Sequence, residues 1–256
     1  MKRLRFVVTA GPTREHLDPV RFLSNPSTGK MGFAVARAAA RRGHDVTLVA
    51  GPVSLRTPKG VSRVDVVSAR DMLAAVEEAL FRGPRTANHE PRATVFVSTA
   101  AVADWRPASC AARKLKKGQM SDTLRLVRNP DILKEIGRLA GRRPSDPQTL
   151  KPSNTFLVGF AAETDDVLAE ARRKCREKHL EMIVANDVTE KGSGFGTNTN
   201  RVTFVKKDGS VERLPLMSKL AVATRIVREI ERISNVESFT DRLQIANAPL
   251  TAMREI

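Results

Sequence analysis

The beginning of the chain contains a strand, a long polar loop and a helix, in an order that favours a parallel α/β sheet. The apolar run Phe6-Val7-Val8 predicts a buried strand, and the Ala-rich pattern over residues 33–42 predicts a helix. The loop between them, residues 9–32, is about twenty residues long, whereas most strand-to-helix connections take only a few. Because parallel sheets bind ligands on the loops that follow their strands, this loop is the first candidate for a binding site.

The rest of the chain repeats this alternation of strand and helix. Strands are predicted at residues 4–9, 45–49, 64–67, 94–98, 155–160 and 182–185, and helices at residues 31–42, 69–81, 130–139, 165–179 and 218–233. This order predicts an α/β fold with a doubly wound, mostly parallel (Rossmann-like) sheet and helices on both faces. An Asp-Gly turn at residues 207–210 joins residues 202–205 to 211–214 and predicts an antiparallel hairpin excursion. We expect one domain over residues 1–236 and a loosely packed C-terminal tail over residues 237–256.

The composition excludes several classes of protein. With 41% hydrophobic residues the 256-residue chain is globular rather than disordered, and its longest apolar runs are too short to span a membrane. The N-terminus passes directly into a strand and lacks the apolar region and cleavage site of a signal peptide. Cys110 and Cys175 have no metal-ligand spacing and the four histidines are scattered, which argues against a transition-metal site. We therefore expect a reducing, cytoplasmic location and no membrane contact.

The net charge of +16 raises a second possibility, a non-catalytic nucleic-acid-binding module. The basic residues, however, fall in separate clusters, at residues 41–42, 114–117, 142–143, 172–178 and 206–207 and in the C-terminal helix. Ten Phe, one Trp and no Tyr leave few side chains for stacking on bases. Small anionic substrates explain the clusters near loops better, so no specific nucleic acid is expected, and the nucleic-acid module remains an alternative.

The common nucleotide-binding motifs are not matched. Gly29-Lys30 resembles the end of a P-loop, but Met31 stands where a Ser or Thr would hold magnesium, and Ser24 replaces the leading glycine. No G-x-G-x-x-G fingerprint follows the first strand, and no helical pattern follows the glycine-rich residues 192–196. These departures disfavour another nucleotide-dependent enzyme on a Rossmann-like fold, although that alternative stays open.

Several stretches of the chain form a series. DPVRFLSN (18–25) and STGKMG (27–32) are followed by AAVADWRP (100–107) with KLKK (114–117), VRNPDIL (127–133), and GFAAETDD (159–166) with ANDV (185–188). In this order the series resembles the bacterial phosphopantothenate–cysteine ligases, the synthetases of coenzyme A biosynthesis. Pro26 stands where these relatives commonly carry His, and Trp105 where Tyr is usual. Both substitutions lie beside matched residues, so we expect an altered pocket shape and the same chemistry.

The resemblance implies an enzyme that joins phosphopantothenate to L-cysteine through an acyl-cytidylate, while CTP is converted to CMP and pyrophosphate. Mg²⁺ is the implied cofactor and CTP the co-substrate, with ATP as a second possibility and no flavin. The resemblance also implies a homodimer, for which the hairpin at residues 201–215 offers a sheet edge with Phe204, Val205 and Leu214 as apolar contacts. Because the chain begins at the synthetase strand, we expect a separate flavoprotein decarboxylase to act next in the pathway.

The resemblance further implies the site residues. Asn25 and Lys114 correspond to catalytic positions, and Arg21, Asn25 and Ala101 to substrate-binding positions. The positions that correspond to nucleotide contacts are Ser98, Thr99, Ala100, Asp104, Lys114, Pro130, Asp131, Ile132, Leu133, Phe160, Lys174 and Lys178. Asp104 is also the implied contact to Mg²⁺ through the nucleotide.

The chemistry suits these residue types. An asparagine amide can hold an acyl group without adding charge, and a lysine on a mobile flap can neutralise an α-phosphate. Lys174 and Lys178 are four residues apart and share one helix face. Asn129 is the expected N-cap of the helix that Pro130 opens, and its amino end would face a phosphate or base. Taken alone, Asn25 would be interpreted as a turn or cap residue. For Lys114 a solvated basic loop is the alternative that stays open.

Overall fold

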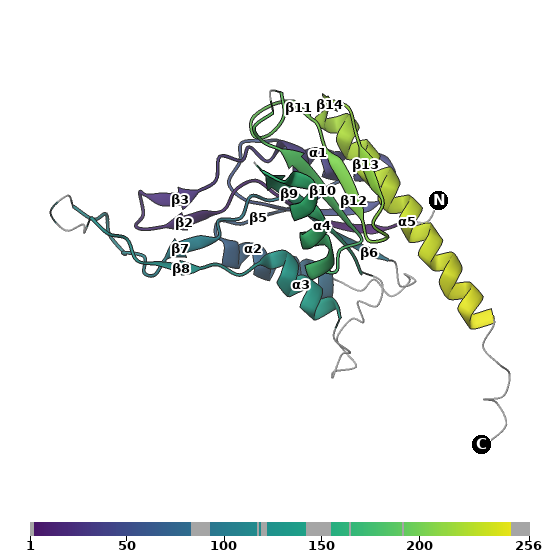
Figure 1. Cartoon of the computed structure of the whole chain (residues 1–256). Helices are drawn as coiled ribbons and strands as arrows, with labels where there is room; N and C mark the ends of the chain where they lie inside the picture. Colours follow the sequence, from purple (N-terminus) through teal and green to yellow (C-terminus); the bar gives the residue numbers. More distant parts are fainter. Residues whose placement is uncertain are drawn as a thin grey trace, which may run out of the picture.

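The centre of the molecule is an eight-stranded sheet (Figure 1). The computed structural model describes residues 3–82, 93–116, 118, 122–141, 155–163, 165–190 and 192–246, and for Arg82 and residues 236–246 it describes the backbone only. The strands of the sheet are β1 Arg5–Ala10, β4 Asp45–Ala50, β5 Ser62–Asp65, β6 Thr94–Ser98, β9 Thr155–Glu163, β10 Met182–Asp187, β12 Thr203–Lys206 and β13 Val211–Arg213. Their order is β13-β12-β10-β9-β6-β1-β4-β5, and the strands from β10 to β5 are parallel. The predicted parallel α/β sheet is therefore confirmed.

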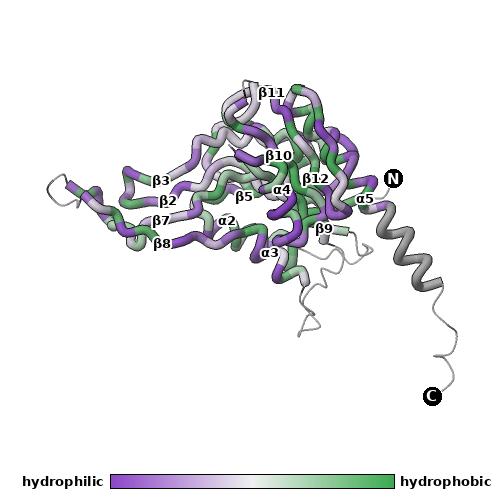
Figure 2. The backbone as a smooth tube through the Cα atoms, in the orientation of Figure 1, coloured by the Kyte–Doolittle hydropathy of each residue, from purple (hydrophilic) through white to green (hydrophobic). Residues whose placement is uncertain are grey.

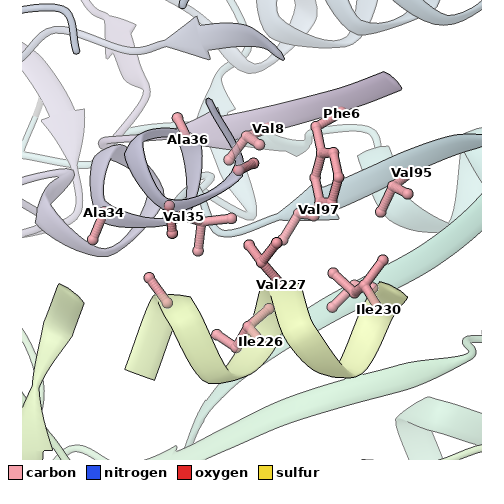
Figure 3. Close-up of a cluster of buried hydrophobic side chains, with 14 of the residues drawn as sticks. Phe6, Val8, Ala34, Val35, Ala36, Val95, Val97, Ile226, Val227 and Ile230 are labelled. Atoms are coloured by element: carbon pink, nitrogen blue, oxygen red, sulfur yellow. The ribbon is translucent and has the colours of Figure 1, made fainter. Parts of the chain in front are cut away.

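Helices cover both faces of this sheet. They are α1 Lys30–Arg41, α2 Ala69–Glu77, α3 Ile132–Ala140, α4 Val167–Glu177 and α5 Lys219–Ala246. Because successive side chains of a strand point to opposite faces, Phe6 and Val8 of β1 pack with α1 and α5 (Figure 3), whereas Val7 belongs to the core beneath α2, α3 and α4. Each such fully buried side chain contributes about 1.5–3 kcal/mol relative to an exposed one. This double burial explains why the central strands are apolar without alternation.

The chain order of the strands defines where the sheet can bind a ligand. From β1 the chain moves outward through β4 to β5, and then it returns to β6 on the other side of β1 and continues through β9 to β10. The switch point therefore lies between β1 and β6, and the loops that leave these two strands diverge there. Ligands of doubly wound folds bind in the crevice that such diverging loops leave.

Several predicted bounds differ from the structure. Strand β5 lies two residues earlier than expected, and α2 ends at Glu77 and continues as a π-helix, Glu78–Arg82. The helix expected to end at residue 233 continues to Ala246, so that prediction was wrong. The structure does not describe the side chains of the predicted tail, so the prediction that the tail packs loosely stays a prediction. Neither α5 nor any other helix in the described part of the chain is both long and apolar enough to cross a membrane.

Two antiparallel ribbons that the sequence did not indicate project together from the body and are called the arm below (Figure 1). One pairs β2 Arg14–His16 with β3 Phe22–Ser24, and the other pairs β7 Trp105–Pro107 with β8 Leu126–Arg128. A third short ribbon pairs β11 Thr199–Asn200 with β14 Met217–Ser218. In Figure 2 the hydrophobic segments concentrate in the strands of the main sheet, so the arm is an extension of the body rather than a second core.

The predicted hairpin exists but belongs to the main sheet. β12 pairs antiparallel with β10, and β13 pairs antiparallel with β12. Phe204, Val205 and Leu214 are at most 6% exposed and pack in the two cores of the chain itself. The suggestion that these three side chains form a dimer contact is therefore wrong, because they have no surface left to offer.

Candidate functional site

A pocket opens at the switch point, at the carboxyl ends of β1, β6, β9 and β10. It encloses about 650 Å³ including its mouth. Its lining comprises residues 27–32, Thr99, Ala100, Ala101, Phe160, Ala162, Asn186, Val188, Gly194, Phe195, Asn200 and Lys219. Of the residues expected from the sequence, Thr99, Ala100, Ala101 and Phe160 thus lie together in one cavity. The position of the pocket is that of a small-molecule site.

The amino end of α1 faces this pocket. Its N-cap is Gly29, which has a φ of 75° and offers no side chain to cap the helix. The N–H groups of a first turn have no intrahelical acceptor, so this end of α1 is suited to an anion. A Cβ on Gly32 would lie 2.4 Å from Thr99 Oγ1 and 2.5 Å from Ala10 Cβ. Only glycine therefore allows α1 to come this close to the ends of β1 and β6.

Two lysines add positive charge to the pocket. Lys30 Nζ donates to Gly196 O at 2.8 Å and to Asn198 Oδ1 at 2.9 Å, and Lys219 Nζ donates to Gly194 O at 2.9 Å. Lys219 is only 8% exposed, and burial together with the charge of Lys30 lowers its pKa. Neither ammonium group forms an ion pair with a carboxylate of the described residues. The pocket therefore holds two cations whose partners are neutral oxygens.

Asn25 joins the loop after β1 to the loop after β6. Its Nδ2 donates to the carbonyl oxygens of Ala101 and Val102, both at 3.1 Å. Because both amide hydrogens are used in this way, the group that Asn25 still offers is the acceptor Oδ1. Ser24 of the same loop donates through its hydroxyl to Thr13 O at 2.7 Å. Asn25 thus lies at the edge of the pocket in a fixed orientation.

Arg21 lies in the arm and does not line the pocket. The buried carboxylate of Asp18 accepts hydrogen bonds from Arg21 Nε at 3.0 Å, from Arg21 Nη2 at 2.5 Å, and from the N–H groups of Val20, Arg21 and Leu115. Burial alone would raise the pKa of Asp18, but these bonds hold it well below its usual range. Arg21 Nη2 also donates to Leu115 O at 2.8 Å. This clamp fixes the backbone directly after Lys114, whose side chain is exposed.

A second group of expected residues surrounds the start of α3. Asn129 donates its N–H to Asp104 O and its Nδ2 to Ala103 O, both at 2.8 Å. The expectation that Asn129 caps the helix and that Pro130 opens its first turn is wrong. The N-cap is Asp131, which accepts from Lys134 N at 3.1 Å, so that α3 begins at Ile132. Asn129 instead fastens the Asp104 loop to the start of α3.

Both lysines expected on α4 are held by carboxylates. Lys178 pairs with Asp131 at 2.7 Å, and Lys174 pairs with Glu163 at the end of β9. Burial would raise the pKa of Asp131, but the hydrogen bond from Lys178 and the N–H of Lys134 lower it. Ser98 ends β6, and Ile132 and Leu133 are buried in the core. Asp104, Pro130, Asp131 and Lys178 therefore form one group beside the loop that leaves β6.

Asp104 fits the implied contact with magnesium. Its side chain is exposed and accepts no hydrogen bond from the described residues. Mg²⁺ sites commonly combine one or two carboxylates with phosphate oxygens of a nucleotide, so one carboxylate at this position is a suitable donor.

The fold contributes residues that the sequence did not single out. In the sequence, Lys30 stands out only as part of a P-loop motif that is incomplete. No motif or pattern in the sequence marks Lys219 as a site residue. The first turn of α5 reaches the pocket only because α5 lies against α1 (Figure 1). Asp18 begins the DPVRFLSN stretch, so the sequence does mark its position. Its role as the buried carboxylate that accepts hydrogen bonds in the arm depends on a contact with the distant Leu115, which the sequence does not show.

The comparisons with known proteins agree with the fold. Residues 1–233 match the family model described as the DNA/pantothenate metabolism flavoprotein C-terminal domain. The Coenzyme A biosynthesis bifunctional protein CoaBC of Vibrio cholerae is 47% identical over 228 residues, which cover 88% of this chain and 52% of that protein. CoaBC of Bacillus subtilis is 46% identical over 229 residues, which cover 89% and 51% respectively. The chain therefore spans about half the length of the curated relatives it matches.

Solved structures give the same result. The crystal structure of the C-terminal domain of CoaBC has a TM-score of 0.69 at 40% identity, and the match covers 91% of this chain and 96% of that chain. Cab2 in complex with phosphopantothenate-cysteine has a TM-score of 0.69 at 15% identity, with 94% and 89% covered, which shows a shared fold. The order of the sequence stretches, the doubly wound sheet and these matches agree, so the chain belongs to the family of the DNA/pantothenate metabolism flavoprotein C-terminal domain, the family of the C-terminal half of CoaBC.

Proposed function

We propose that this chain ligates phosphopantothenate to L-cysteine with CTP as the energy source. The observation that carries the proposal is the pair Lys30 and Lys219, which lies in the pocket beside Asn25. Among the described residues, neither lysine is paired with a carboxylate. A phosphate monoester has a charge of about −1.5 to −2 at neutral pH, so two ammonium groups and the amino end of α1 match it well. Relatives that carry out coenzyme A biosynthesis support the choice of this substrate.

The first step activates the carboxylate. A carboxylate oxygen of phosphopantothenate attacks the α-phosphorus of CTP, the bond to the β-phosphate breaks, and pyrophosphate leaves with the electron pair. Several negative charges approach one another in this step, and cations must offset them. Lys114, Lys178 and the amino end of α3 are the protein groups we assign to this task. A magnesium ion held by Asp104 would supply further positive charge at the phosphates.

The second step forms the amide. The neutral amine of L-cysteine attacks the acyl carbonyl, the bond to the cytidylate oxygen breaks, CMP leaves, and the amine loses a proton to solvent. Both hydrogens of the Asn25 amide are bound to backbone carbonyls, so its free Oδ1 is an acceptor. We assign to this oxygen the orientation of the cysteine amine, because an acceptor suits an N–H and not a carbonyl.

We further propose that the chain forms a homodimer through the arm. Four large apolar side chains of the arm, Val20, Phe22, Trp105 and Leu126, are between 38% and 56% exposed. A second copy would bury them. Within the same proposal the reaction takes place in the cytoplasm and a separate flavoprotein decarboxylase acts on the product. The relatives are bifunctional, so the decarboxylase partner of this chain stays a prediction.

Direct binding tests the assignment of the pocket. Calorimetric titration should detect phosphopantothenate and should show at least a tenfold weaker affinity for pantothenate, which lacks the phosphate. A chromatographic assay with CTP, Mg²⁺ and L-cysteine should then yield phosphopantothenoylcysteine.

Equal affinities for the two compounds would show that Lys30 and Lys219 do not bind the phosphate of the substrate. Turnover with ATP as fast as with CTP would contradict the proposed nucleotide preference. The alternative function, a nucleic-acid-binding module, would require tight binding to one defined sequence at physiological salt without any product.

A further inference from the structure

A second cavity lies between α4 and the β12–β13 hairpin, near the amino end of β10. It encloses about 980 Å³ including its mouth and shares no residue with the pocket described above. Its walls carry Arg172, Arg176, His179, Lys206 and Lys207, and none of its lining residues is acidic. In the sequence these cations belong to two distant basic clusters. The packing of α4 against β12 (Figure 1) brings the clusters together. We call the cavity that they line the basic groove.

The charges of the basic groove are only partly balanced. Lys206 pairs with Glu229 at 2.8 Å, and Lys207 pairs with Glu181 at 3.3 Å. Arg172 and Arg176 are exposed, and their guanidinium groups form no ion pair or hydrogen bond with the described residues. They are four residues apart on α4, so their guanidinium groups share one face of the helix. By contrast, the neighbouring Arg173 is paired with Glu170 at 2.7 Å and with Glu177 at 2.6 Å.

The end of α4 does not repel an anion as an open helix end would. The carbonyl oxygens of Lys174, Cys175 and Arg176 accept hydrogen bonds from the N–H groups of residues 178–180, at 2.9–3.2 Å. These acceptors are therefore used within the chain. The floor of the basic groove is apolar, since Leu180 and Val205 are buried there. A ligand that fits has an anionic end for the arginines and a less polar part for the floor.

We propose that the basic groove is a second binding site, which takes a small molecule that carries phosphate. A planar guanidinium presents paired donors that match phosphate oxygens, and two of them four residues apart can bind one phosphate or a diphosphate. Lys207, from the hairpin between β12 and β13, and His179, directly after α4, also line the basic groove and add positive charge or hydrogen-bond donors there. This site is distinct from the ligase pocket, because the two share no lining residue and the basic groove includes neither Asn25 nor Lys219, although His179 directly follows Lys178 in the chain.

Pyrophosphate is the probe we choose, and nuclear magnetic resonance of the full chain gives a readout at each site. Signals of the His179 ring and the Gly209 amide should shift and saturate at low millimolar pyrophosphate or below, at constant ionic strength in 150 mM salt. Signals of Gly194 in the ligase pocket report separately on binding there. Saturation at Gly194 with no change at His179 would overturn the second site and leave the proposed function intact.

Two variants complete the test. Arg172→Gln with Arg176→Gln should weaken the pyrophosphate affinity read at His179 at least tenfold, while the ligase rate stays within twofold of the wild type. Arg173→Gln is the matched control on the same helix and should keep that affinity within twofold. Equal losses in both variants would mean that the groove attracts anions only through its general charge. Binding of an acidic peptide but not of pyrophosphate would mean that the groove is a protein contact, and either result rejects the proposal.

Discussion

Asn25 Nδ2 lies 3.1 Å from the carbonyl oxygen of Ala101, so the loop after β1 and the loop after β6 are joined at the edge of the pocket. A second bond to Val102 O uses the other amide hydrogen. The orientation of the Asn25 amide is therefore set by the protein before any substrate arrives. Since the two loops belong to the two strands at the switch point, this contact also fixes the width of the crevice there.

The first prediction concerns Asn25→Asp. The new carboxylate would face two carbonyl oxygens, so it should turn away or separate the loops, and it would bring negative charge to the acyl group. We expect turnover to fall about a hundredfold or more, as when a positioned polar group is lost from an active site. Release of CMP with cysteine should suffer more than release of pyrophosphate without it. Single-turnover measurements of both products check this, and wild-type rates would show that Asn25 has been assigned wrongly.

The second prediction is that Lys219→Met stabilises the fold while it weakens substrate binding. Burial lowers the pKa of Lys219, so its positive charge destabilises the folded state at neutral pH. Removing this penalty should raise the Tm, by about 2–4 °C for each kcal/mol gained in a chain of this size. The KM for phosphopantothenate should rise at least tenfold. Lys206→Met is the matched control, because it removes a lysine that is paired with Glu229, and it should lower the Tm and leave KM unchanged.

The third prediction is a pH effect that arises from the same lysine. Lys219 must be charged to bind phosphate, and its pKa lies below the ordinary 10.5. As the pH rises through this lowered pKa the ammonium loses its proton, so the KM for phosphopantothenate should increase at a pH where ordinary lysines remain charged. The increase should disappear in Lys219→Met, whose KM is high at every pH. A wild-type KM that rises only in the pH range where ordinary lysines lose their charge would contradict the assignment.

The fourth prediction concerns Asp18→Asn in the arm. The pKa of Asp18 is depressed in the folded chain, so its stabilising effect is present above the unfolded-state value of about 3.9 and is lost as the pH falls through the folded-state value. At neutral pH the variant should have a lower Tm, and this difference should shrink as the pH falls below about 4. Ligase activity should also fall, because the clamp supports the backbone next to Lys114. Thermal unfolding of both proteins across this pH range provides the measurement, and a difference that grows towards low pH would refute it.

The sequence predicted the sheet and its helices well because their signals are long and periodic. The strand Thr94–Ser98 was predicted with its observed bounds, and the start of α1 within one residue. The arm was missed because each of its strands has only three residues, too few to show alternation. Asp131 was mistaken for a first-turn residue because Asn129 is an equally good cap by type, and only the bond to Lys134 N distinguishes them. Lys219 could not be predicted, because only the packing of α5 on α1 brings it to the pocket.

The fifth prediction separates stability from function. Glu231 of α5 accepts from Arg42 Nη2 at 2.7 Å and contacts His44 Nε2 at 2.8 Å, and its side chain is 8% exposed. Because Leu4 N donates to His44 Nδ1, the neutral ring donates its Nε2 hydrogen to Glu231.

Glu231→Gln leaves Arg42 without its counter-charge and should cost on the order of 3 kcal/mol of stability. The cluster lies at the amino ends of the strands, away from the pocket, so KM and kcat measured below the Tm should stay within twofold. A large fall in kcat would mean that this end of the sheet contributes to the site.

The measurement that tests the ligase account most directly is the release of pyrophosphate from CTP in the absence of cysteine. With phosphopantothenate and Mg²⁺ we predict a burst of about one equivalent per chain, as an acyl intermediate accumulates. Mass spectrometry of the quenched reaction should detect phosphopantothenoyl-cytidylate, and added cysteine should convert it to phosphopantothenoylcysteine and CMP. Pyrophosphate release that does not require phosphopantothenate, or product formation without any cytidylate, would contradict the account.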